Sequence, residues 1–328
     1  MDERAACAQA WAFTTLNDSS WAVETIGSDA SARRYFRLIK PNQSVILMDS
    51  PPATEPIAPF MDVQERLKAA GIHVPEILAA KPTEGFLLLS DMGHTAYLES
   101  LRGSNPDSLF DDAEKALVTI QTQASTAGMS HYEPAKLLSE LNLFIDWFLT
   151  HHWRVEPSAD ELDDWDELCA CLVRWALDQP QTFCHRDFMP RNLMVSQPNP
   201  GVLDFQDAVI GPISYDPISL YLDAFISWPR DYVDARLEQY RQHALREGLE
   251  VPNNQAVWLQ TCDLMSTQRH LKVIGIFARI AYRDGKPRYL SDVDRFFNYL
   301  GQTIHRRPEL QRLAHLLEAW ADRKATLH

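Results

Sequence analysis

The most informative stretch of this chain is Cys184-His185-Arg186-Asp187-Phe188-Met189-Pro190-Arg191-Asn192. It reads H-R-D-x-x-x-x-N, and Asp204 follows twelve residues after Asn192. An apolar run after Asn192, a turn at 198–201 with proline and glycine, and a second apolar run before Asp204 together predict a β-hairpin. Ionised carboxylates offer only acceptor oxygens, and Mg²⁺ prefers hard oxygen ligands. An aspartate-rich loop held by a helix cap and a salt bridge is the alternative interpretation.

This pattern resembles the catalytic loop and the metal-binding aspartate of kinase-like phosphotransferases. The resemblance implies that Asp187 accepts the proton of an attacking hydroxyl. It also implies that Asn192 and Asp204 converge on Mg²⁺ that bridges the phosphates of ATP. The expected fold is therefore α+β and bilobal, like that of the protein kinases, with a small N-lobe (an antiparallel sheet and a helix) and a larger, mostly helical C-lobe.

The sequence after Asp204 differs from that of protein kinases. Phe205-Gln206-Asp207 stands where they have Phe-Gly, and the segment 211–220 replaces their Ala-Pro-Glu motif. The chain resembles the aminoglycoside phosphotransferase and choline kinase group, in which an aspartate opens a helix just after the metal site. Asp216, which precedes Pro217, is therefore expected to be structural, as the N-cap of such a helix.

Bulk composition limits the class of protein. The chain has 328 residues, of which 45% are hydrophobic and 23% charged, as in ordinary globular proteins. Its net charge of −14 argues against nonspecific nucleic-acid binding. Five cysteines without metal-type pairing indicate thiols in a reducing compartment. We find no signal peptide and no apolar run of about 18 residues, so we expect a cytoplasmic protein with no membrane span.

The order of predicted elements divides the chain into two lobes. A leading helix, three strands, a helix near 59–70 and two further strands make up the N-lobe, residues 1–93. The C-lobe, residues 94–328, is expected to contain the catalytic hairpin and the substrate site, and its apolar spacing is that of helices. One of these predicted helices spans 135–151 and another spans 254–283. Length alone is compatible with two domains.

Small residues form the first strand turn, which in this superfamily covers the ATP phosphates. Because small residues let backbone N–H groups approach phosphate oxygens, Gly27, Ser28 and Ser31 are assigned to nucleotide binding. A plain hairpin turn would look similar. Ser90 and Met92, which precede a hinge expected at Gly93, are assigned to the nucleotide as well.

The phosphate-binding lysine of kinase-like folds is missing. The third strand carries Met48 at that position, and methionine cannot supply the charge. Three readings remain: a pseudokinase, an arginine substitute among Arg33, Arg34 and Arg37, or reliance on Mg²⁺ and backbone donors. The intact catalytic set favours the last two readings, and Arg34 is assigned to nucleotide binding.

Three further segments indicate which small-molecule kinases the chain resembles most. Residues 27–37, residues 48–52 and residues 283–290 are similar to the anomeric sugar kinases of bacterial cell-wall recycling. That resemblance implies ATP-dependent phosphorylation of N-acetylmuramate or N-acetylglucosamine at the C1 hydroxyl, giving the sugar 1-phosphate for UDP-sugar synthesis. It also accounts for the absent lysine. The alternatives are a kinase for an aminoglycoside, choline or homoserine, and a nucleotide-binding regulator without turnover.

Substrate contacts are harder to read from sequence. Glu140 and Asp146, on the helix before the catalytic loop, are assigned to the sugar, as are Arg191 and Asp207. Each could equally belong to a solvated helix face or a loop cap. The lactyl carboxylate of muramate requires a cation, for which Arg154 and Arg191 are candidates. We expect a small-molecule sugar as the substrate, and no nucleic acid, membrane or obligate protein partner.

Overall fold

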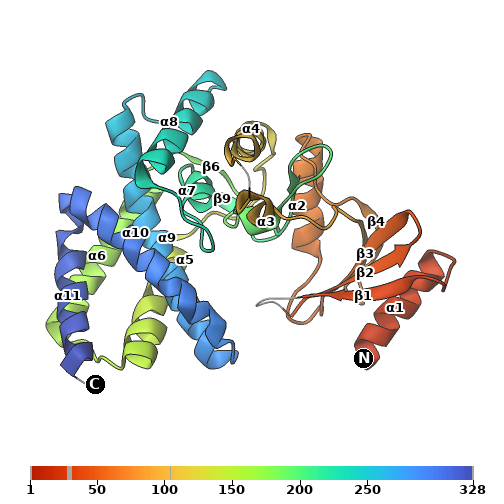
Figure 1. The fold of residues 1–328 in the computed structure, drawn as a ribbon, viewed down its shortest axis with the longest axis horizontal. Coiled ribbons are helices and arrows are strands. Elements are labelled where there is room, and N and C mark those ends of the chain that lie inside the picture. The colour runs from red at the N-terminus through yellow and green to blue at the C-terminus, as the bar shows by residue number, and fades with distance from the viewer. Residues whose placement is uncertain (1, 28–31, 104, 327–328) are drawn as a thin grey trace. The chain divides into compact units, whose positions relative to one another are not determined.

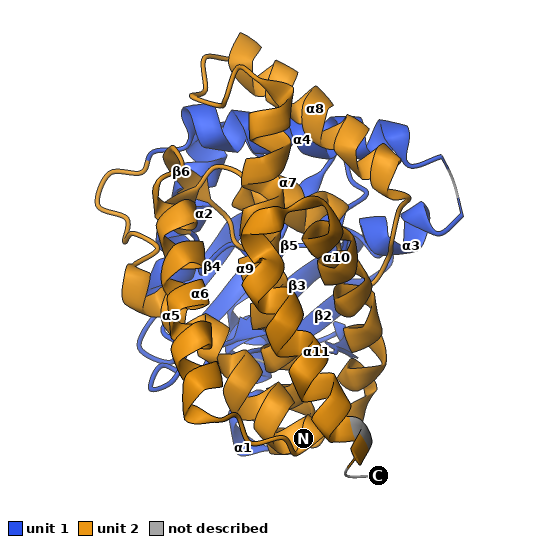
Figure 2. Cartoon of the chain, turned by 90° about the vertical axis from the view of Figure 1, so that its left-hand side faces the viewer, with its two compact units in different colours: residues 1–125, 190–208 blue, residues 126–189, 209–328 orange. Residues whose placement is uncertain are grey.

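The computed structural model describes residues 2–27, 32–103 and 105–326. The chain divides into two compact units, residues 1–125 with 190–208 and residues 126–189 with 209–328 (Figure 2). The short segment 190–208 therefore belongs to the first unit, although in sequence it lies within the second.

The first unit combines strands with a few helices (Figure 1). Its strands are β1 (Ala22–Ile26), β2 (Arg34–Lys40), β3 (Gln43–Asp49), β4 (Ile77–Lys81), β5 (Phe86–Ser90), β7 (Leu193–Met194) and β8 (Gly201–Val202). Its helices are α1 (Glu3–Thr15), α2 (Ala58–Ala69), α3 (Tyr97–Leu101), α4 (Asp107–Gln123) and the 3₁₀ turn η2 (Pro190–Asn192).

Five of these strands form one antiparallel sheet in the order β1-β2-β3-β5-β4. Alternate side chains of a strand point to opposite faces, so one face can be apolar throughout. Helix α1 lies beside this sheet (Figure 1) and packs on that face through its alanines. The buried cluster comprises Ala5, Ala8, Ala12, Phe36, Leu38, Leu47, Phe86 and Leu88. The predicted three-strand meander and the helix that follows it are present.

The second unit is mostly helical. Its helices are α5 (Pro134–Leu143), η1 (Phe144–Trp153), α6 (Ala159–Leu177), α7 (Tyr215–Tyr221), α8 (Arg230–Arg246), α9 (Gln255–Arg283), η3 (Pro287–Asp292), α10 (Val293–Arg306), η4 (Pro308–Leu310) and α11 (Gln311–Thr326). Its strands β6 (Gln181–Cys184) and β9 (Val209–Pro212) form an antiparallel pair. The 29-residue α9 contacts most of the other helices.

The predicted helix over 135–151 is not one α-helix. The α-helix ends at Leu143, and a π-helix, η1, continues from Phe144 to Trp153. The change in winding occurs where Gly275 of α9 lies against the backbone of Leu143 and Phe144. A search for 3.6-residue periodicity cannot detect this wider winding. Such π-helical segments are frequent at functional sites.

Two element ends have a local cause. Helix α7 ends at Tyr221, and beyond it the side chain of Asp223 accepts the N–H groups of Phe225 and Ile226 and holds a turn. Strand β4 begins at Ile77, beyond Pro75, which has no N–H to donate to a ladder.

The lobe boundary expected at Gly93 lies inside the first compact unit, and the assignment of lobes stays a prediction. Within the described residues, none of the helices has the length and apolar character needed to cross a bilayer.

Candidate active site

Strand β6 leads directly into the candidate catalytic loop, which begins at His185. It pairs with β9, with Cys184 opposite Val209, and His185 follows directly. Arg186 then adopts a left-handed backbone with φ of 73°. A non-glycine residue in that region costs free energy and persists only where the surroundings enforce it.

Asp216 supplies part of that enforcement. Its carboxylate is buried and accepts the backbone N–H of His185 at 2.7 Å and that of Arg186 at 2.9 Å. Burial raises the pKa of Asp216 to about 7, although these two hydrogen bonds act in the opposite direction. The expected N-cap role is wrong: Ser214 is the N-cap of α7, and Asp216 uses its acceptors on the distant catalytic loop.

The side chain of Arg186 enters a buried ion-pair cluster. It donates to Glu140 of α5 at 2.7 Å, and the ammonium of Lys272 on α9 lies 3.2 Å from the other oxygen of Glu140. Lys272 also donates to the hydroxyls of Tyr132, at 3.3 Å, and Tyr215, at 3.1 Å. The cluster links the catalytic loop to three helices and a tyrosine before α5.

Charges in this cluster hold one another ionised. Burial opposes the charge of Glu140, but Lys272 and Arg186 outweigh it and lower the pKa of the carboxyl. Burial likewise opposes the charge of Lys272, but Tyr215 and Glu140 raise its pKa overall. Glu140, which the sequence assigned to the sugar, is thus surrounded by protein groups, and a contact with substrate stays a prediction.

Asp187 lies at the edge of this cluster. Its backbone N–H donates to Nδ1 of His185 at 3.3 Å, and its carboxylate interacts electrostatically with Lys272, Arg186 and Asp216. The histidine side chain therefore helps to hold the loop backbone. Because the loop is fixed at Asp216 and Arg186, the carboxylate of Asp187 is presented by an ordered segment.

Asn192 and Asp204 meet in the first unit. Strands β7 and β8 pair, with Leu193 opposite Val202, so the residues just before and after the hairpin come together. The Nδ2 of Asn192 lies 3.4 Å from Oδ2 of Asp204. Asp204 is exposed and has a left-handed φ of 62°, and Gln206 donates to its Oδ1 at 2.9 Å.

These two side chains fit a magnesium site. One carboxylate and one carboxamide are hard oxygen donors, and Mg²⁺ usually takes one or two carboxylates and completes its shell with phosphates and water. Within residues 2–27, 32–103 and 105–326 there is no group of three or more His, Cys, Asp and Glu arranged to hold a metal. A site built from Asp204 and Asn192 would therefore depend on the nucleotide for further ligands.

Arg33 is linked to Asp204 through Tyr35. Its guanidinium donates a hydrogen bond to the hydroxyl of Tyr35, a half-buried side chain that interacts electrostatically with Asp204. Burial raises the pKa of Tyr35 to about 12, and the negative charge of Asp204 acts in the same direction. Arg33 also pairs with Glu55 at 3.1 Å. Met48, at the position of the missing lysine, is fully buried and carries no charge.

Two of the other residues assigned to the nucleotide, Arg34 and Ser90, have protein partners. Arg34 pairs with Asp2 and Asp49. Ser90 accepts the N–H of Glu76 at 2.8 Å, while Met92 is buried and Gly27 is exposed. Predictions for Ser28 and Ser31 fall outside the described residues. All of these roles stay predictions.

The remaining sugar assignments are scattered. Asp146 is exposed on η1, Asp207 is exposed just after the metal aspartate, and Arg191 lies on η2. Asp207 and Arg191 belong to the first compact unit and Glu140 to the second, and their contact with a sugar stays a prediction. Sequence reasoning missed Lys272; the available signal was a lysine within the apolar pattern of α9, next to Leu271 and Val273.

Comparison with known proteins agrees with this geometry. A profile of the phosphotransferase enzyme family matches residues 22–252, most of the chain. This chain belongs to that family. The predicted ATP-dependent phosphotransferase is thereby confirmed.

Two bacterial relatives resemble the phosphotransferase along nearly its whole length. One, from Pseudomonas aeruginosa, is named N-acetylmuramate/N-acetylglucosamine kinase and is 52% identical over 290 residues, 88% of this chain and 86% of that protein. Another of the same name, from Pseudomonas putida, is 44% identical over 317 residues, 94% of each chain.

Solved structures confirm the kinase-like fold of the phosphotransferase. A choline kinase from Streptococcus pneumoniae matches with a TM-score of 0.64 at 16% identity, covering 92% of this chain and all of that one. An ADP-bound aminoglycoside phosphotransferase matches with a TM-score of 0.62 at 13% identity, covering 91% and 98%. At such low sequence identity these matches support the fold alone, and not a substrate.

Proposed function

We propose that this phosphotransferase transfers the terminal phosphoryl group of ATP to the anomeric hydroxyl of N-acetylmuramate and N-acetylglucosamine. The observation that carries the proposal is the 52% identity, over most of both chains, to a kinase named for these two sugars. The product would be the sugar 1-phosphate, used for UDP-sugar synthesis in peptidoglycan recycling. Because the phosphoryl donor is ATP, we place the reaction in the cytoplasm.

Asp187 is the proposed general base. Its carboxylate accepts the proton of the sugar O1–H while O1 bonds to the γ-phosphorus, and the bond from that phosphorus to the β–γ bridging oxygen breaks to release ADP. The anomeric hydroxyl is more acidic than an ordinary sugar alcohol, so a carboxylate suffices. Lys272 and Arg186 are positioning residues in this proposal, because they act through Glu140 and the loop.

Asp204 and Asn192 are the proposed magnesium ligands. Mg²⁺, when bound, offsets negative charge on the phosphates and on the departing ADP. The proximity of their side chains, 3.4 Å between Asn192 Nδ2 and Asp204 Oδ2, supports this assignment. Arg33 is proposed to take over part of the absent lysine's role, because it bonds Tyr35 beside Asp204.

A screen of ADP release tests the proposal. The protein is incubated with ATP, Mg²⁺ and each of N-acetylmuramate, N-acetylglucosamine, choline, homoserine and an aminoglycoside. We expect turnover with at least one amino sugar, and a product that releases phosphate in mild acid, because an anomeric phosphate is acid-labile. Turnover with choline or an aminoglycoside and none with the sugars would refute it. An acid-stable sugar phosphate would refute the anomeric position alone.

A further inference from the structure

Arg279 stands out in α9 by its lack of protein partners. Among the residues the structure describes, it has no hydrogen bond and no ion pair, and its Nε is buried with no acceptor. Arg283, one turn further along α9, is paired with Asp284 at 2.7 Å. Arg186, on the catalytic loop, is paired with Glu140. Among the described residues, Arg279 is therefore a half-buried cation without a hydrogen-bonded countercharge.

The surroundings of Arg279 disfavour its charge. Burial lowers the pKa of its guanidinium, and the neighbouring Arg283 lowers it further, while Asp284 and Glu140 act more weakly in the opposite direction. A guanidinium nevertheless stays protonated in proteins. An anion that bound Arg279 would relieve this imbalance, and a carboxylate can accept two parallel hydrogen bonds from the guanidinium fork.

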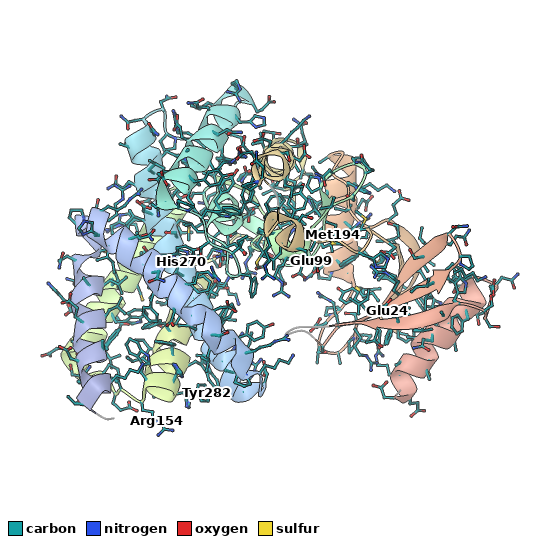
Figure 3. All side chains as sticks on the ribbon, in the orientation of Figure 1. Glu24, Glu99, Arg154, Met194, His270 and Tyr282 are labelled. Atoms are coloured by element: carbon teal, nitrogen blue, oxygen red, sulfur yellow. The ribbon has the colours of Figure 1, made fainter. Side chains whose placement is uncertain are left out.

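The position of Arg279 connects it with the candidate base. It follows Lys272 by seven residues, nearly two helical turns, so both side chains leave the same face of α9 about 10 Å apart along the axis. Lys272 interacts with Asp187 and Glu140, and Arg279 interacts with Glu140 as well. Tyr282, labelled in Figure 3, lies three residues beyond Arg279 near the end of this helix.

Two other arginines that the sequence suggested are less suitable. Arg154 is exposed at the end of η1 (Figure 3), where water and salt would weaken any pair with a carboxylate. Arg191 lies in the other compact unit and already interacts with other residues. Partial burial without a partner distinguishes Arg279 from both.

We infer that Arg279 binds the lactyl carboxylate of N-acetylmuramate and sets the preference for muramate over glucosamine. This inference rests on the proposed function, which supplies the two sugars. They differ at C3, two ring positions from the C1 that bears the reacting hydroxyl, and only muramate carries a carboxylate there. Arg279 lies on the face of α9 that carries Lys272, which interacts with Asp187, but nearly two helical turns further along. From there it can bind the carboxylate at C3 without contacting the reacting atoms at C1.

Arg279→Gln tests the inference through the ratio of two activities. We expect kcat/KM for N-acetylmuramate to fall about 10- to 100-fold, mainly through KM, because one charge-assisted contact is lost. The kcat/KM for N-acetylglucosamine should change less than about twofold, since that sugar has no carboxylate. Arg279→Lys, which keeps the charge but not the fork, should lose less muramate activity than Arg279→Gln.

Arg283→Gln is the matched control. This variant removes a charge from the same helix, but Arg283 is exposed and paired with Asp284. The ratio of kcat/KM for N-acetylmuramate to kcat/KM for N-acetylglucosamine should therefore remain at the wild-type value. Calorimetric binding of N-acetylmuramate to Arg279→Gln, without ATP, provides a second readout and should show the same loss of affinity.

Three results would overturn the inference. Equal losses for both sugars would make Arg279 a structural residue, and activities unchanged for both sugars would show that another group binds the carboxylate. A wild-type protein that phosphorylates glucosamine and ignores muramate would also refute it, while leaving the sugar kinase itself standing. Absence of wild-type turnover with either sugar is the separate outcome that removes the proposed function and, with it, this inference.

Discussion

The carboxylate of Asp216 accepts the backbone N–H of His185 at 2.7 Å, and so ties the start of α7 to the catalytic loop. The N–H of Arg186 donates to its other oxygen. Both donors are attached to a loop whose backbone is left-handed at Arg186. The ordered position of Asp187 therefore depends on a residue 29 positions later in the sequence.

Asp216→Ala should destabilise the protein. The substitution leaves two backbone N–H groups without their acceptor, at a cost of about 1–3 kcal/mol for each group that stays buried. We expect urea unfolding to show a loss of about 2–5 kcal/mol, and kcat to fall as well. Asp322→Ala, on the exposed surface of α11, is the control and should be neutral. A variant as stable as wild type would show that water replaces the carboxylate.

The pKa of Asp216 predicts a specific dependence of stability on pH. Burial raises this pKa to about 7 in the folded protein, from a reference value of 3.8. Between these values the folded protein holds a proton that the unfolded chain has released. The contribution of Asp216 is therefore complete below the reference pKa and is lost as pH rises through about 7.

Comparison of the wild type with Asp216→Asn isolates this effect. Asparagine does not titrate, and the contributions of all other titratable groups cancel in the difference between the two proteins. The melting temperature of wild type minus that of the variant should decrease steadily from about pH 4 to about pH 7.5. Thermal unfolding in a series of buffers measures this difference. A difference that rises with pH would mean that the hydrogen bonds from His185 and Arg186 outweigh burial.

The Glu140 cluster should behave as one coupled unit. Glu140→Gln removes the countercharge of Lys272 and Arg186, and breaking a buried pair from one side costs about 3–5 kcal/mol. Lys272→Met should also destabilise, but the double variant should lose less than the sum of the two. Urea unfolding of all four proteins gives the coupling free energy.

Lys136 provides the control for this cycle. Its ammonium lies 3.7 Å from Glu140, but its side chain is 57% exposed. Exposed pairs contribute about 0–1 kcal/mol, so Lys136→Met should have little effect. Additive losses for Glu140 and Lys272 would contradict the coupling that their 3.2 Å contact implies.

Asp187→Asn should reduce turnover sharply. An amide cannot accept the proton of the sugar hydroxyl, and loss of a general base lowers kcat by about 10² to 10⁴. ATP affinity, measured by calorimetry, should be retained, because the assigned metal ligands are Asn192 and Asp204. Asp322→Asn is the control. If Asp187→Asn kept full activity, another group would have to be the base.

Sequence reasoning succeeded where a contact depends on local spacing. Asn192 and Asp204 flank a hairpin whose turn and apolar runs are legible in the chain, so their proximity could be predicted. The five-stranded sheet followed from alternation and turn residues. The predicted ends of the helices at 59–70 and 254–283 lie within one residue of those of α2 and α9.

Contacts between distant segments could not be read in this way. Lys272 follows Asp187 by 85 residues, and only packing of α9 against α5 brings it to Glu140. Asp216 before Pro217 has the local signature of an N-cap, but its partners come from a loop some 30 residues earlier. The π-helix at Phe144 departs from the 3.6-residue period on which the helix prediction was based.

Gly275→Ala should disturb the packing of α9 against η1. A Cβ at this position would lie 2.4 Å from the carbonyl carbon of Leu143 and 2.6 Å from the nitrogen of Phe144, so backbone atoms must move. Overpacking of this kind costs about 1–3 kcal/mol, which outweighs the gain of about 1 kcal/mol from replacing glycine inside a helix. Urea unfolding should therefore show a net loss. Gly301→Ala, in α10 with open space around its Cβ position, isolates the helix term and should stabilise by about 0.5–1 kcal/mol. If both variants gained stability equally, the two helices could separate at no cost, and the close approach would not explain the change in winding at Phe144.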